Sequence, residues 1–114
     1  MPIEIIKVKI SQEKFQLLAQ ENYKILIKGV ADIAQKIIAL GGELYADAEA
    51  VLLEGGSQQK DLWGFNIYLD KSRDDRIEYT SFINIRPRDN NFSLEVQSPE
   101  IKLKIEEIVN EFIE

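Results

Sequence analysis

The chain has 114 residues, with 20 acidic and 14 basic side chains and neither cysteine nor histidine. The missing cysteine excludes disulfides, thiolate nucleophiles and cysteine-ligated metal centres, and the missing histidine excludes Ser-His-Asp and imidazole acid–base catalysis. A net charge of −6 argues against a nucleic-acid-binding module, which needs a basic face.

The length predicts one globular domain over residues 1–114. The first ten residues, MPIEIIKVKI, carry charged side chains inside an apolar stretch, and this pattern is neither a signal peptide nor a membrane span. We therefore expect a cytoplasmic protein that does not enter a membrane. The remaining chemistry is that of carboxylates, Lys, Arg, Tyr and hydroxyl groups, and no cofactor is predicted.

Residues 3–10 are predicted to form a strand, because apolar side chains alternate with Lys7 and Lys9. A helix follows over residues 12–20, with Ser11 as its N-cap. An acidic residue in its first turn suits the exposed N–H groups there.

Residues 23–40 fit two structures. As a helix, their apolar side chains fall at spacings of 4, 3, 4 and 3 and form one stripe. As a hairpin with strands over 24–34 and 37–45, β-branched residues cluster in both arms, and Gly29 costs no helix stability. The turn near residues 34–36 is the weak point of the hairpin, because it lacks Gly, Asn and Asp. Periodicity alone therefore favours the helix.

A short helix is predicted over residues 47–55, with Asp47 as its N-cap and Gly55-Gly56 at its end. The clearest strand covers residues 63–69, where alternate side chains are apolar and point one way. Trp63 begins this strand, so we expect it in the core rather than as a stacking platform.

Residues 77–86 alternate in the same way as the preceding strand. A hairpin that pairs Leu69 with Ile77 places both apolar sets on one face. After a turn at Asp89-Asn90, a further strand is predicted over residues 92–97, with Phe92, Leu94 and Val96 as its apolar set.

The last helix is predicted over residues 99–113, with Ser98 as its N-cap and Pro99 at its first position. Together these elements predict an α+β fold. It has a largely antiparallel sheet with an N-terminal helix, a short middle helix and a C-terminal helix packed on it. The long helix over residues 23–40 is the alternative.

Five short motifs occur in order along the chain. They are GGELYADAE at 41–49, LEGGS at 53–57, DLWG at 61–64, NIY at 66–68 and INIRP at 83–87. Together they resemble a small bacterial family of domains of unknown function. The resemblance implies no activity, because none is assigned to the family. It implies a hairpin rather than a helix for residues 24–44, because relatives carry glycine in the turn. Relatives also carry histidine where this chain has Tyr45, so an imidazole-based role at that position is in doubt here.

Four acidic residues lie in a segment without basic residues, and they are Glu43, Asp47, Glu49 and Glu54. If they converge, they can bind Mg²⁺ or Ca²⁺ or act as a coupled acid–base pair. The alternative is a solvated helix start whose acids face the N-terminal amides. This alternative is favoured, and no metal site is predicted, because the spacing of a cation-binding loop is absent.

A polar face of the predicted sheet is the second candidate. Its members are Asn66, Tyr68, Asn84, Arg86, Ser93, Glu95 and Gln97. The face can form a recess for a small anion or a peptide, or it can be an ordinary solvated face on which Arg86 pairs with Glu95. Phe82 lies on the same side, and an aromatic ring among polar neighbours indicates that a helix or a second subunit covers it.

Two functions of different class remain open. The favoured one is a non-enzymatic binding or protein-interaction domain that self-associates, through an exposed sheet edge or face, or binds a protein partner. The alternative is an enzyme or small-ligand-binding protein in which a carboxylate acts as base and a guanidinium holds an anion. The candidate ligand-binding residues are Glu43, Asp47, Glu49, Asn66, Asn84 and Arg86.

Overall fold

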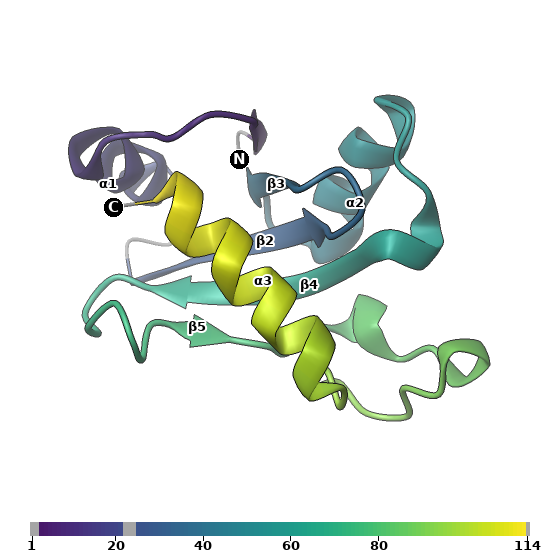
Figure 1. Ribbon diagram of the computed structural model, residues 1–114. Helices are drawn as coiled ribbons and strands as arrows, with labels where there is room; N and C mark the ends of the chain where they lie inside the picture. Colours follow the sequence, from purple (N-terminus) through teal and green to yellow (C-terminus); the bar gives the residue numbers. More distant parts are fainter. Residues whose placement is uncertain (1–2, 22–24, 114) are drawn as a thin grey trace.

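A computed structural model describes residues 3–21 and 25–113 (Figure 1). Its five strands form one antiparallel sheet in the order β1-β3-β2-β4-β5. The strands are β1 (Ile3–Ile6), β2 (Leu26–Asp32), β3 (Ile37–Gly41), β4 (Leu62–Tyr68) and β5 (Ile77–Glu78). The helices are α1 (Gln12–Gln20), α2 (Tyr45–Glu54) and α3 (Pro99–Phe112). The predicted α+β class and the order of the three helices are confirmed.

The sheet has helices on both faces. Figure 1 shows α3 crossing the front of the strands, with α2 behind β3. On the front face, Phe15 of α1 and Ile105 of α3 belong to one core cluster with Phe65 of β4. On the back face, Leu52 of α2 packs with Val30 of β2 in a second cluster. No helix within the described ranges is long and apolar enough to cross a membrane.

Strands β2 and β3 form a hairpin, so the long helix over residues 23–40 is wrong. The turn takes its polar group from Asp32, the residue just before it, whose Oδ1 accepts hydrogen bonds from the N–H groups of Ala34 and Gln35, both at 2.9 Å. Lys36 supplies the left-handed conformation, with φ at 59°. The apolar stripe arose because β2 and β3 are covered on both faces, which removes the alternation of a half-exposed strand.

The predicted strands over residues 77–86 and 92–97 are wrong beyond Glu78. Ile77 pairs with Ile67 rather than with Leu69, and the remainder of the two segments makes only isolated bridges. Instead of continuing along the edge of the sheet, residues 81–84 cross β4 on the face that α2 covers. A Cβ at Gly64 would lie 2.4 Å from the Cβ of Ser81, so this crossing requires glycine.

Both predicted serine caps are confirmed, and the predicted cap of α2 is wrong. Ser11 accepts a hydrogen bond from the N–H of Lys14 at 3.1 Å, and Ser98 accepts one from Ile101 at 3.2 Å. Helix α2 begins two residues earlier than predicted, so Asp47 lies inside its first turn, and the cap residue Leu44 makes no side-chain hydrogen bond. The acid still lies where the helix dipole favours it.

Other boundaries differ from the predictions by a few residues. Strand β1 stops at Ile6 instead of continuing to residue 10, and β3 stops at Gly41 instead of residue 45. The predicted first residue of the 24–34 strand lies outside the described residues. Trp63 is buried, as predicted.

Candidate functional site

Four large apolar side chains are exposed on the loop that follows β5. Their exposed fractions are 77% for Phe82, 46% for Ile85, 66% for Phe92 and 37% for Leu94. We call these four residues the loop apolar patch. The sequence pattern pointed to Phe82 alone, since Phe92 and Leu94 were expected to point inward with Val96, and only Val96 is buried.

Backbone pairing brings three of these side chains to one side of the loop. Arg86 and Asn91 exchange two backbone hydrogen bonds, at 2.8 and 3.0 Å. Their neighbours Ile85 and Phe92 flank this closed pair on the side away from the turn, and both side chains are exposed. Phe82 is three residues before Ile85, at the start of a 3-10 turn over Phe82–Asn84, and this spacing stacks the two side chains on one side.

Asn84 anchors the loop to the sheet. Its side chain is completely buried. Its Oδ1 accepts a hydrogen bond from the N–H of Gly64 at 2.8 Å, and its Nδ2 donates to the carbonyl of Gly64 at 3.0 Å. Nδ2 also donates to the carbonyl of Leu94 at 3.2 Å. The amide group thus replaces the backbone of a further strand beside β4.

Asn91 closes the other side of the loop. Its Nδ2 donates to the carbonyls of Asn84, Ser93 and Glu95 at 2.7, 2.9 and 3.1 Å, and its Oδ1 accepts from the N–H of Gln97 at 2.7 Å. Sequence reasoning missed this residue. The available signal was an asparagine directly after a turn, a place where Asn side chains bond nearby backbone.

Arg86 holds the loop against the start of β4. Its guanidinium lies 3.8 Å from the centre of the Trp63 ring, and its Nη1 donates to the carbonyls of Gln59 and Leu62 at 2.7 and 2.8 Å. Its Nε is 3.2 Å from Asp89. Burial lowers the pKa of Arg86, while Asp89 and then Glu49 act in the opposite direction. These contacts describe a structural anchor.

The predicted pairing of Arg86 with Glu95 is wrong. The turn is closed by Arg86 and Asn91, so Glu95 lies opposite Thr80 and forms its ion pair with Lys102 of α3, at 3.6 Å. Asn90, whose φ is 60°, permits a tight turn between Arg86 and Asn91. The resulting pairing moves the carboxylate of Glu95 away from the guanidinium of Arg86.

The predicted acidic residues do not gather around one point. Glu43 and Asp47 are exposed, and Glu49 is half-buried and close enough to affect the pKa of Arg86. Within residues 3–21 and 25–113, no three acidic side chains converge in the way a metal ion requires. A cavity of about 360 Å³ lies beside Arg86, and neither Asp47 nor Glu49 lines it.

Asn66 belongs to a separate polar network on the α2 side of the sheet. It accepts a hydrogen bond from the hydroxyl of Tyr45 and donates to Glu78 at 2.8 Å. The hydroxyl of Tyr68 also donates to Glu78, at 3.3 Å. Burial and the charge of Glu78 raise the pKa of Tyr68. Tyr45 thus serves as a hydrogen-bond donor within this network.

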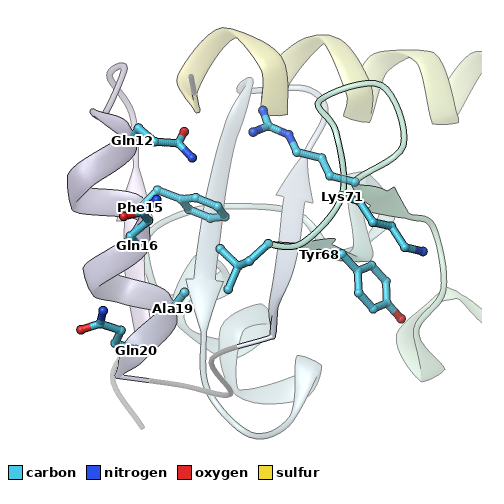
Figure 2. A pocket seen from close by; sticks show the side chains of 9 residues that line it. Gln12, Phe15, Gln16, Ala19, Gln20, Tyr68 and Lys71 are labelled. Carbon is cyan, nitrogen blue, oxygen red and sulfur yellow. The ribbon is translucent and has the colours of Figure 1, made fainter.

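A second cavity, of about 250 Å³, lies between α1 and the end of β4. In Figure 2, Phe15 points into this space from α1, whereas Tyr68 and Lys71 lie on its far side. Arg76 also lines the cavity, but its Nη2 donates to the carbonyl of Ile113 at 2.8 Å and so fixes the end of α3. Of the predicted polar face, Tyr68 lines this cavity, whereas none of the six candidate ligand-binding residues does.

The fold and the loop define an α+β protein with a rigidly held apolar surface. A family model described as a protein of unknown function (DUF5674) matches residues 4–112, and the chain belongs to this family. The resemblance inferred from the sequence motifs, to a family of unknown function, is confirmed. No curated protein and no solved structure is significantly similar to the chain.

Proposed function

We propose that the protein is a non-enzymatic, cytoplasmic interaction domain that forms homo-oligomers through the loop apolar patch. The observation that carries the proposal is the combination of exposure and rigidity. Phe82 and Phe92 are mostly exposed, while the backbone beneath them is held by the buried amides of Asn84 and Asn91.

The area of the patch supports an interaction role. With about 200 Å² for a whole phenylalanine side chain and slightly less for Leu and Ile, the four side chains expose about 400 Å². The largest apolar patch on a monomeric protein typically measures about 300–600 Å² and is often functional. A patch of this size on one short loop is therefore a reasonable interface centre.

The rigidity of the loop supports it as well. A flexible loop loses conformational entropy when it docks, and that loss weakens binding. Here the hydrogen bonds of Asn84, Asn91 and Arg86 already fix the backbone in the free chain. The apolar side chains are thus presented to a partner without a large ordering cost.

The sheet edges are poorer candidates for self-association than the patch. Strand β5 is two residues long, and β1 has four residues followed by the exposed Lys7 and Lys9. Short edges and lysines are features that oppose edge-to-edge pairing. The surface-patch form of the homo-oligomer is therefore preferred over the edge form.

A ligand-binding or catalytic role for Asp47, Glu49, Asn84 and Arg86 is the alternative proposal. Only the electrostatic effect of Glu49 on Arg86 supports it. The amide of Asn84 is committed to backbone groups, and Nη1 of Arg86 already donates to two carbonyls. Asn84 therefore has no donor left for a substrate, and Nη2 of Arg86, which lacks a hydrogen-bond partner among the described residues, is buried away from solvent.

Sedimentation equilibrium tests the proposal. We expect the wild type to self-associate with a dissociation constant of about 1 mM or lower. A dissociation constant of about 1 mM corresponds to a free energy of association of about −4.1 kcal/mol. The variant Phe82→Ser/Phe92→Ser should be monomeric in the same range. Val8→Ser removes an equally exposed apolar side chain outside the loop and should behave like the wild type. A wild type that stays monomeric at about 1 mM would contradict the proposal.

A further inference from the structure

The loop that carries the apolar patch has a basic end and an acidic end. We infer that two copies dock in antiparallel orientation, so that the basic end of each loop meets the acidic end of the other. This inference rests on the proposed self-association and adds the orientation and the charged contacts of the interface.

The basic end is the turn at residues 87–90. Lys60, Arg86 and Arg88 line the cavity of about 360 Å³ at this turn. Asp89 is the one acidic residue among the lining side chains, and it already faces Nε of Arg86 at 3.2 Å. Lys60 and Arg88 are exposed, so they are available to a carboxylate of a partner. Glu49 and Asp61 are half-buried and act on Arg86, so the charges that this end presents outward are those of Lys60 and Arg88.

The acidic end is Glu95, where the loop returns to the sheet. It lies opposite Thr80, next to β5, and its side chain is 59% exposed. Its contact with Lys102 is 3.6 Å long, and exposed ion pairs of this kind contribute only about 0–1 kcal/mol. Glu95 can therefore exchange Lys102 for a cation of another chain at little cost. The loop apolar patch lies between Glu95 and the turn.

The size of the patch requires the charged ends to take part. The exposed area of about 400 Å² per copy is half of the about 800 Å² that each partner contributes to a standard interface. The rest must come from groups that border the patch, and these are the turn and the residues near Glu95. An interface centred on the patch thus buries both ends of the loop.

The charges select one of the two orientations that a two-fold axis permits. A parallel arrangement would place Lys60 and Arg88 against the same residues of the second copy, and like charges at an interface repel. The antiparallel arrangement places Arg88 of one copy near Glu95 of the other, twice in each dimer. The basic, apolar and acidic parts of the loop are then complementary to themselves.

Charge reversal tests the orientation, with dimer dissociation constants from sedimentation equilibrium at low salt. Arg88→Glu and Glu95→Arg should each weaken the dimer about tenfold, because each change converts two attractive contacts into repulsive ones. The double variant Arg88→Glu/Glu95→Arg should recover to within about threefold of the wild type. Lys7→Glu changes the net charge as Arg88→Glu does, on a residue that follows the opposite edge strand, and serves as the matched control.

The outcomes separate this inference from the proposed function. If single reversals leave the dissociation constant at the value of Lys7→Glu, or if the double variant does not recover, the antiparallel orientation is wrong while self-association through the patch stands. If the wild type is monomeric at about 1 mM, both fail. All variants are at exposed positions, so circular dichroism should show them folded as the wild type.

Discussion

Replacement of Asn84 by alanine tests whether buried amides hold the loop in place. The substitution removes hydrogen bonds to the N–H and carbonyl of Gly64 and to the carbonyl of Leu94. It leaves the N–H and the carbonyl of Gly64 without a partner, and each such group costs about 1–3 kcal/mol, whereas the carbonyl of Leu94 still accepts from the N–H of Ser81 at 3.0 Å. Because partial relaxation and water entry offset some of this, we expect Asn84→Ala to lower the free energy of unfolding by about 2–4 kcal/mol.

Urea denaturation followed by the fluorescence of Trp63 measures this loss. Trp63 is the one tryptophan of the chain, and its ring lies against the guanidinium of Arg86, which belongs to the loop that Asn84 anchors. Asn90→Gly is the matched control in the neighbouring turn, since Asn90 has a φ of 60° that glycine adopts without strain. The control should change stability by less than about 1 kcal/mol. A loss for Asn84→Ala as small as that of the control would refute the anchoring role.

Three further predictions concern the hairpin, the crossing over β4 and a titrating phenol. Gly64→Ala should destabilise the protein by about 2–4 kcal/mol in thermal unfolding, because its Cβ would lie 2.4 Å from Ser81. The control Gly55→Ala should be nearly neutral, because a Cβ at Gly55 has only ordinary contacts, the shortest at 3.5 Å. Asp32→Ala should lower the free energy of unfolding by about 2–4 kcal/mol in chemical denaturation. The substitution removes the carboxylate that accepts hydrogen bonds from the N–H groups of Ala34 and Gln35 and from the Ser57 hydroxyl at 2.6 Å. An unchanged denaturation midpoint would contradict the role of Asp32 in the turn. Burial, aided by Glu106, raises the pKa of Tyr79 from 10.0 to about 12. Between these two pH values the folded protein keeps the phenol proton that the unfolded chain loses, so the free energy of unfolding should fall as the pH rises from 10.0 to about 12. Ultraviolet titration should show a phenol ionising near 12 that disappears in Tyr79→Phe, and an unaltered titration curve in that variant would contradict the assignment.

The strands and helices with a clear period could be predicted from the sequence. Alternation located β4, and the Ser-Pro start located α3, because these signals depend on neighbours along the chain. The hairpin of β2 and β3 was harder, since strands covered on both faces lose their alternation and resemble a helix. There the turn residue Asp32 was present in the sequence but lay two positions before the expected turn at residues 34–36.

The loop after β5 could not be predicted, because its path depends on a contact distant in sequence. Residues 77–97 carry an alternating pattern, yet the segment around Ser81 crosses β4 where Gly64 leaves room. This crossing turns Ile85, Phe92 and Leu94 outward. Local periodicity contains no information on such a crossing, so Phe82 was the one member of the patch that sequence reasoning singled out.

A comparison of amide resonances between dilute and concentrated samples tests the proposed association of copies of this chain through the loop apolar patch. We expect concentration-dependent shifts in residues 82–95 and at Lys60, with the amides of α1 unchanged. Shifts confined to other surfaces, or no shifts at any concentration, would contradict association through the patch.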